Sequence, residues 1–174
     1  MRIERLGGHH ELGTFHCGVK SLDDWLAVHA LDNQRRNLSR SFLLVDDTDE
    51  VLGYYSLTMG GVHRDDLPRR YGRGLPDYDI AMVLLARLAV TEHRQGEGLG
   101  RDLLIEAIER AALAGEHAAA RFIAVDPINS DAAAFYREFG FVAVPGDEAG
   151  RMFIRIDTAN ASLDRGRSGR PESV

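Results

Sequence analysis

A near-continuous hydrophobic run from Met82 to Val90 predicts a buried β-strand in the middle of the chain. Polarity rises abruptly over residues 91–93, which indicates a turn. Beyond the turn, apolar residues recur every three or four positions, as they do along one face of an amphipathic helix. These residues are Leu99, Leu103, Leu104, Ala107, Ile108 and Ala111. We expect the helix to begin near Gly98 and to end at Gly115, because glycine suits a helix C-terminus.

The N-terminal part of the chain predicts three more strands and a helix. Residues 2–6 form a short strand in this prediction, and residues 41–45 and 51–59 form an antiparallel hairpin that precedes the central strand. A helix is expected from Ser21, whose hydroxyl suits an N-cap. The residues expected to share its apolar face are Leu22, Trp25, Leu26 and His29.

The C-terminal part predicts the rest of the sheet. A buried strand over residues 121–125 is followed by a short helix that Gly140 closes, and strands over 141–144 and 152–156 complete the sheet. From Asp157 onward the chain has no aromatic residue and is rich in Ser, Gly, Arg and Asp, so we expect disorder there. The prediction is therefore a single domain over residues 1–156 and a disordered tail over 157–174.

Composition narrows the class of protein. With 174 residues, of which 44% are hydrophobic, the chain can bury one sizeable core. The lone Cys17 excludes an internal disulfide, and without a Cys-His-Asn arrangement it is expected to be a packed residue. The N-terminus has neither a signal peptide nor a spanning segment, so we expect a cytoplasmic protein without membrane association. A formal net charge of −6 argues against a surface that is basic all over, but it leaves RNA binding undecided. No two of the seven histidines lie four residues apart, as they do in a helical metal motif, so no metal site is expected.

The turn between the central strand and its helix is rich in glycine. Gly96, Gly98 and Gly100 let the backbone approach a ligand closely, with unpaired amide N–H groups at the positive end of the helix dipole. The turn is therefore either a phosphate cradle or a flexible loop before a core helix. It is not a Walker loop, because no Gly-Lys-Ser/Thr follows, and its spacing is not that of a Rossmann fingerprint.

Two motifs together suggest a family. The pattern Gln-x-x-Gly-x-Gly, from Gln95 to Gly100, directly follows the strand end Arg87-Leu88-Ala89-Val90 and resembles the acetyl-CoA pyrophosphate motif of the GNAT N-acetyltransferases. A second match, Asn-x-x-Ala-x-x-x-Tyr-x-x-x-Gly-Phe, spans Asn129 to Phe141. The resemblance implies an α/β GNAT fold: a central mixed, mostly antiparallel sheet that is splayed at the acetyl-CoA site and flanked by helices.

The resemblance also implies a site for acetyl-CoA as co-substrate. The pantetheine arm would pair with the edge of the central strand, and the pyrophosphate would meet the amides of the glycine turn. The cofactor-binding residues expected on this basis are Leu88, Ala89, Val90, Gln95, Gly96, Glu97, Gly98, Leu99, Gly100, Arg101, Asn129 and Tyr136.

Tyr136 is the expected catalytic residue. Attack of an amine on the thioester expels a thiolate, and a phenol held close to the sulfur can supply its proton. The alternative is that Tyr136 only packs in the core, with its hydroxyl bonded to a neighbour. No general base is assigned, because Glu92, His93 and Asp126 are equally well explained as turn residues. An α-amino group, with a pKa near 7 to 8, needs little help from a base.

Further segments from Phe15 to Phe141 resemble the GNAT toxins of bacterial toxin–antitoxin pairs. They include Phe15 to Gly18, Ser21 to Leu26 and Leu52 to Leu57. The resemblance implies acetylation of the α-amino group of aminoacyl-tRNA, which blocks translation. It also implies a ribbon-helix-helix antitoxin as partner and a homodimer.

A tRNA substrate would need a local basic surface on this acidic chain. The candidate residues are Arg35, Arg36, Arg64, Arg69, Arg70 and Arg73, some of which lie beside Tyr71 and Tyr78. Contacts to phosphates and bases are one interpretation, and a solvated loop neutralised by neighbouring aspartates is the other. Two other functions stay open: a GNAT enzyme acting on a small amine or protein N-terminus, and a non-catalytic acetyl-CoA-binding regulatory module.

Overall fold

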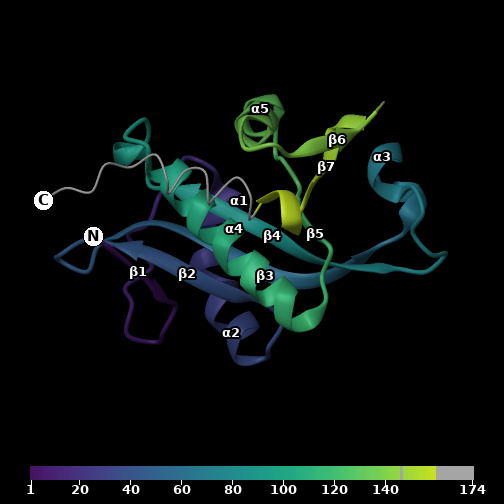
Figure 1. Cartoon of the computed structure of the whole chain (residues 1–174). Coiled ribbons are helices and arrows are strands. Elements are labelled where there is room, and N and C mark those ends of the chain that lie inside the picture. Colours follow the sequence, from purple (N-terminus) through teal and green to yellow (C-terminus); the bar gives the residue numbers. More distant parts are fainter. Residues whose placement is uncertain (146, 160–174) are drawn as a thin grey trace, which may run out of the picture. The chain divides into compact units, whose positions relative to one another are not determined.

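The computed structural model describes residues 1–145 and 147–159, without the side chains of 147–149. Seven strands form one sheet in the order β1-β2-β3-β4-β5-β7-β6 (Figure 1). The strands are β1 (Arg2–Arg5), β2 (Arg40–Val45), β3 (Val51–Val62), β4 (Ile80–Val90), β5 (Phe122–Val125), β6 (Val142–Val144) and β7 (Asp147–Arg155). The α-helices are α1 (Lys20–Asp24), α2 (Ala30–Arg35), α3 (Arg69–Gly72), α4 (Leu99–Ala118) and α5 (Ser130–Glu138). The shorter helical segments are η1 (Trp25–His29), η2 (Arg64–Asp66) and η3 (Glu92–Arg94).

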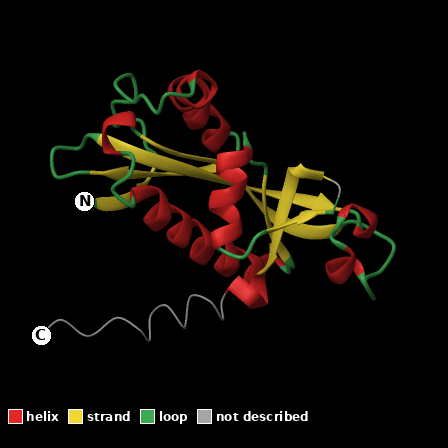
Figure 2. Cartoon of the chain, turned by 90° about the horizontal axis from the view of Figure 1, so that it is seen from above, coloured by secondary structure: helices red, strands yellow, loops and turns green. Residues whose placement is uncertain are grey.

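The predicted fold class is confirmed. The pairs β1·β2, β2·β3, β5·β7 and β6·β7 are antiparallel, whereas β4 and β5 are parallel, so the sheet is mixed and mostly antiparallel. Helices and strands both build the fold, as an α/β class requires (Figure 2). Among the described residues, no helix is long and apolar enough to span a membrane.

The chain divides into two compact units. The first unit comprises residues 1–58 and 85–107, and the second comprises residues 59–84 and 108 onward. The predicted splay of the sheet concerns the relation between these units and stays a prediction.

The core of the first unit lies between the N-terminal helical segment and the strands. Leu26, Leu43 and Tyr54 are almost completely buried in it. The Tyr54 hydroxyl donates a hydrogen bond to the carbonyl oxygen of Leu22 (2.9 Å), which joins β3 to α1. This buried tyrosine is therefore anchored at both its ring and its hydroxyl.

The N-terminal helical segment differs from the prediction in two details. Its first helix begins at Lys20 with Val19 as the N-cap, so Ser21 lies inside the helix and the predicted cap is wrong. The Asp23 carboxylate instead accepts a hydrogen bond from the backbone N–H of Cys17 (2.9 Å). The π-helical turn η1 adds a residue to the helical repeat, so Ala30 is buried and His29 is exposed.

The second unit packs around aromatic side chains. Phe122 on β5 and Phe153 on β7 meet edge to face, with ring centroids 6.3 Å apart, and Tyr71 packs against Phe122. In the predicted tail, residues 157–159 continue as helix, and Ala159 is buried. Residues 160–174 lie outside the described part of the chain.

The predicted end of α4 at Gly115 is wrong, because the helix continues to Ala118. Ala119 takes the left-handed conformation (φ 55°), and the N–H of Ala120 donates to the carbonyl oxygen of Gly115 (3.0 Å), as in a Schellman cap. Gly115 serves packing instead, since a Cβ there would lie 2.3 Å from Cδ1 of Ile156.

A second close approach occurs at Gly53 on β3. A Cβ at this position would lie 2.7 Å from Cδ1 of Leu103 on α4 and 2.9 Å from the carbonyl oxygen of Ala89 on β4. The absence of a side chain at Gly53 thus lets α4 pack directly on the backbone of the sheet.

We predict that Gly53→Ala lowers the free energy of unfolding by about 1–3 kcal/mol, because the backbone of β4 must move to admit the methyl group. Urea denaturation measures the loss. Gly13→Ala is the matched control, since a Cβ at Gly13 meets no atom within 4 Å. Equal stability of the two variants would contradict the packing described here.

Candidate active site

The backbone that leaves β4 is fixed by hydrogen bonds to two other segments of the first unit. The N–H of Thr91 donates to the carbonyl oxygen of Leu52 on β3 (2.9 Å), and its hydroxyl donates to the carbonyl oxygen of His16 (3.1 Å). The N–H of Glu92 also donates to His16 (2.7 Å). The strand therefore ends in a defined position and direction.

Gln95 braces the same turn through its side-chain amide. Its Nε2 donates to the carbonyl oxygens of Val90 (3.0 Å) and Cys17 (2.9 Å). Its backbone N–H donates to Glu92 (3.3 Å). The donor groups of Gln95 are thus bonded within the protein, so the motif glutamine positions the glycine turn.

The glycine turn presents a row of free amide groups. Gly96 and Gly98 have φ values of 81° and 87°, which are left-handed conformations, and a Cβ on either glycine would meet no atom within 4 Å. The N–H groups of Arg101 and Asp102 both donate to the carbonyl oxygen of Gly98 (3.0 and 3.2 Å). Within the described chain, the amides of residues 96–100 have no acceptor.

These five consecutive N–H groups lie at the positive end of the α4 dipole, which favours an anion. The one carboxylate among the five residues, that of Glu97, accepts a hydrogen bond from Nε of Arg94 (2.8 Å) and is balanced by its charge. The arrangement can hold phosphate oxygens by backbone groups alone.

A hydrogen bond fixes where β5 begins beside β4. The N–H of Arg121, directly before β5, donates to the carbonyl oxygen of Ala81 (2.9 Å). The start of β5 therefore lies beside the first residues of β4. The pairing of the segment from Leu88 to Val90 with an extended ligand stays a prediction.

Helix α5 of the second unit carries the other motif. Oδ1 of Asn129 accepts a hydrogen bond from the N–H of Ala132 (2.8 Å), so Asn129 caps this helix. At the other end, Gly140 has a φ of 88°, and the N–H of Phe141 donates to the carbonyl oxygen of Tyr136 (3.2 Å). The motif residues Asn129 and Gly140 thus set the ends of a helix that carries Tyr136.

Tyr136 is 8% exposed, and its ring packs edge to face on Phe141, with centroids 5.7 Å apart. Burial raises the pKa of its phenol to about 12. None of the described residues forms a hydrogen bond with its hydroxyl, in contrast to Tyr54, whose hydroxyl is bonded to Leu22. The Tyr136 hydroxyl is therefore available to a ligand.

Three other titratable side chains have partners or are poorly ionised. His93 lies between Thr91 (3.3 Å) and Glu50 (3.4 Å), and Asp126 accepts two hydrogen bonds from Arg151 (2.7 and 2.8 Å). Burial, followed by the neighbouring Asp23 side chain, raises the pKa of the Cys17 thiol to about 11. Cys17 is the packed residue that the sequence predicts.

The predicted substrate arginines fall into two groups. Arg35 and Arg36 belong to the first unit, where both are exposed and Arg36 pairs with Asp32 (3.4 Å). The other four belong to the second unit. Arg64 pairs with Asp65 (3.3 Å) and Asp77 (3.2 Å). For this residue the structure fits the alternative in which neighbouring aspartates neutralise the arginine charge.

Of the predicted substrate arginines in the second unit, Arg69, Arg70 and Arg73 are exposed. Arg70 lies over the ring of Tyr71 (4.9 Å to its centroid), and no acidic residue in the described chain forms an ion pair with any of the three. Tyr78, 65% exposed, follows in the same loop. This group keeps the charge that phosphate contacts need.

Residues 14–141 match the acetyltransferase (GNAT) family, and the chain belongs to that family. It is 37% identical over 153 residues to a tRNA-acetylating toxin of Mycobacterium tuberculosis, and the match covers 88% of this chain and 91% of the toxin. The family prediction and the acetyltransferase class are therefore confirmed.

Two solved structures resemble the fold closely. AtaT complexed with acetyl-methionyl-tRNAfMet has a TM-score of 0.84 and 26% identity, with 93% of this chain and 98% of that chain covered. A tyrosine-to-phenylalanine mutant of the AtaT toxin, bound to the C-terminus of the antitoxin AtaR and to acetyl-CoA, has a TM-score of 0.78 and 26% identity. That match covers 93% of this chain and 97% of the toxin.

Proposed function

We propose that this protein is a toxin that transfers an acetyl group from acetyl-CoA to the α-amino group of aminoacyl-tRNA and thereby blocks translation. The observation that carries the proposal is the 37% identity to a tRNA-acetylating toxin over 88% of the chain. Each chemical requirement of this reaction has a matching feature among the described residues.

The first requirement is a site for the acetyl donor, and the start of α4 fits it. The pyrophosphate of acetyl-CoA binds the N–H groups of residues 96–100, whose lack of other acceptors leaves them free for its oxygens. The open space around Gly96 and Gly98 admits the phosphates close to the backbone. The pantetheine amides pair with the β4 edge from Leu88 to Val90.

The second requirement is a proton for the departing sulfur, and Tyr136 supplies it. The amine nitrogen forms a bond to the acetyl carbon, the C–S bond breaks, and the phenol donates its proton to the sulfur. The nitrogen, positively charged once it is bonded, then loses a proton that restores the phenol. The products are an N-acetylated amine and CoA thiol.

The raised pKa of Tyr136 constrains this step. A phenol with a pKa of about 12 stays protonated at neutral pH and is ready to donate. Donation to a thiolate with an ordinary pKa near 8.5 is uphill by about 5 kcal/mol. Because the amine proton finally replaces the donated one, this cost is transient and compatible with turnover.

The third requirement concerns the acceptor. An α-amino group has a pKa near 8 and is partly neutral at cytoplasmic pH, whereas a lysine amine near 10.4 is not. His93 and Asp126 already have partners, so of the three base candidates only the exposed Glu92 carboxylate has no partner among the described residues. An α-amino acceptor, as in aminoacyl-tRNA, fits a site of this kind.

The fourth requirement is attraction of the tRNA phosphates. Arg69, Arg70 and Arg73 provide exposed positive charge although the net charge of the chain is negative.

The proposal also includes a partner, an assembly and a location. The partner is a ribbon-helix-helix antitoxin that holds the toxin inactive, the assembly is a homodimer, and the location is the cytoplasm. AtaT bound to the C-terminus of AtaR is the precedent for the antitoxin.

The donor site predicts that Gly98→Asp weakens acetyl-CoA binding at least 10-fold, because a carboxylate repels the pyrophosphate. Calorimetry on the folded variant measures the affinity. Gly98→Asn tests the same shape without the charge and is expected to bind more tightly than Gly98→Asp. Gly74→Asp makes the same change at another left-handed glycine with open space around it and should bind normally. Unchanged affinity in Gly98→Asp contradicts the donor site.

The proton donor predicts that Tyr136→Phe keeps the ring packed but slows acetyl transfer by about 10- to 10⁴-fold, with little change in acetyl-CoA affinity. Single-turnover assays measure the chemical step. Expression of the variant without an antitoxin should no longer arrest growth. Tyr78→Phe, which alters an exposed hydroxyl, is the control. A wild-type rate in Tyr136→Phe would make Tyr136 a packing residue.

If aminoacyl-tRNA is the acceptor, the rate of its acetylation should fall as the salt concentration rises. Combined Arg69→Glu and Arg70→Glu should raise KM for aminoacyl-tRNA at least 10-fold and reduce the salt slope by about 2, with unchanged acetyl-CoA affinity. Arg5→Glu with Lys20→Glu makes the same change in net charge elsewhere and should leave KM near the wild-type value. An enzyme that ignores every aminoacyl-tRNA but acetylates a polyamine or peptide would replace the toxin by the plain amine acetyltransferase.

A further inference from the structure

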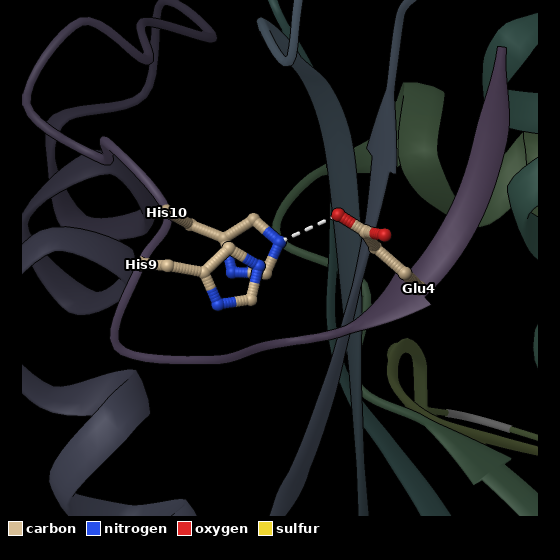
Figure 3. Close-up of side chains that lie close together, drawn as sticks. All are labelled: Glu4, His9 and His10. Atoms are coloured by element: carbon tan, nitrogen blue, oxygen red, sulfur yellow. Dashed lines mark hydrogen bonds and ion pairs between the residues drawn. The ribbon is translucent and has the colours of Figure 1, made fainter.

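Three side chains outside the acetyl-transfer residues converge at the N-terminal edge of the sheet. Glu4 lies on β1, and His9 and His10 lie on the loop that follows this strand (Figure 3). One ligand atom from each residue lies within 4.8 Å of the other two. We propose that Glu4, His9 and His10 form a binding site for a divalent transition-metal ion, with Zn²⁺ as the expected occupant.

His10 is the most firmly held member of the group. Its side chain is only 2% exposed, and its Nε2 lies 2.8 Å from Oε1 of Glu4. Its Nδ1 lies 3.0 Å from both the N–H and the carbonyl oxygen of Gly7. The ring is therefore fixed before any ion binds.

The two contacts with Gly7 suit either tautomer of the neutral His10 ring, with the proton on Nε2 or on Nδ1. Without an ion, the Gly7 N–H donates to Nδ1, and the proton on Nε2 points to Glu4. With an ion on Nε2, the proton moves to Nδ1 and is donated to the Gly7 carbonyl oxygen. Such a bond to a backbone carbonyl is the usual outer support of a metal-bound histidine.

His9 completes the group from the solvent side. Its ring lies beside that of His10, with centroids 4.0 Å apart, and makes no hydrogen bond with any described residue. Gly7 allows this position, because a Cβ there would lie 2.8 Å from Nδ1 and Cε1 of His9. The exposed imidazole thus has a nitrogen available for an ion.

The spacing can reach zinc geometry with small side-chain movements. Zn–N and Zn–O bonds of about 2.0–2.2 Å in a tetrahedron place ligand atoms about 3.3 Å apart. For zinc to bind, the distance between Nε2 of His10 and Oε1 of Glu4 must increase by about 0.5 Å. The distances from the His9 ligand atom to the other two must decrease by up to about 1.5 Å. Water takes the fourth position. Two imidazoles favour zinc and other transition metals over Mg²⁺ or Ca²⁺.

Two arginines lie near the proposed site. Nε of Arg2 donates to Oε2 of Glu4 (3.2 Å), which orients the carboxylate and leaves Oε1 to face the histidines. The Arg35 guanidinium lies beside Gly8, 3.6 Å from where a Cβ would stand. Their positive charges oppose a cation, so we expect weaker affinity than that of a structural zinc site with thiolate ligands.

The test uses the full chain after removal of any affinity tag. Zinc chloride is titrated calorimetrically into the wild type and into His9→Ala, which removes an exposed side chain without hydrogen bonds. Cobalt chloride supplies a visible spectrum that reports the ligands. His117→Ala, at an exposed histidine on α4, is the matched control.

The proposal expects one Zn²⁺ per chain, at least a 10-fold weaker affinity in His9→Ala, and wild-type affinity in His117→Ala. Zinc should also raise the Tm of the wild type more than that of His9→Ala. Glu4→Gln, if it folds, should weaken binding as well. Absence of zinc binding at millimolar concentration, or equal affinity in wild type and His9→Ala, overturns the site. Neither result bears on acetyl-CoA binding.

Discussion

The candidate donor site depends on how the backbone turns at the end of β4. A strand that passes into a helix leaves several amides without partners, and their direction is useful only if the turn is fixed. Gln95 fixes it from one side through Val90 and Cys17, and Thr91 fixes it from the other through Leu52 and His16. Because these bonds use side chains or preceding amides, the N–H groups of residues 96–100 remain free for phosphate.

Tyr54 and Tyr136 show how one residue type serves two purposes. Tyr54 and Tyr136 are both buried, and burial raises the pKa of both phenols. Only the Tyr54 hydroxyl has a protein acceptor, the carbonyl oxygen of Leu22. The Tyr136 hydroxyl forms no hydrogen bond with a described residue and is not among the fully buried polar atoms without a partner, so a ligand can reach it.

Periodicity predicted most elements of the fold because they depend on local burial. The strand from Met82 and the helix from Leu99 are close to their observed bounds. The predicted end of α4 is wrong because the glycine at position 115 serves a packing contact and not a helix end. The contact is with Ile156, a residue far along the chain. Likewise, the π-helical turn that exposes His29 depends on packing that a local pattern does not contain.

The sequence motifs predict where the candidate site lies, but they do not predict the structural role of each residue in it. Gln95 and Asn129 belong to their motifs, yet Gln95 braces the turn and Asn129 caps α5. A motif records which residues a ligand site needs, without separating those that touch the ligand from those that hold the backbone. The sequence does not predict the cluster of Glu4, His9 and His10, because its histidines are adjacent and lack the spacing of a helical metal motif, and Glu4 meets them only through the fold.

Cys17 braces the donor site through its backbone, while its thiol is kept in an unreactive form. Its carbonyl oxygen, and not its sulfur, holds Gln95, and the thiol is buried with a pKa of about 11. At neutral pH only about one thiol in ten thousand is a thiolate, the form that peroxides attack. The phosphate-binding turn is therefore braced through the backbone of a cysteine whose thiol is held in its protonated, less reactive form.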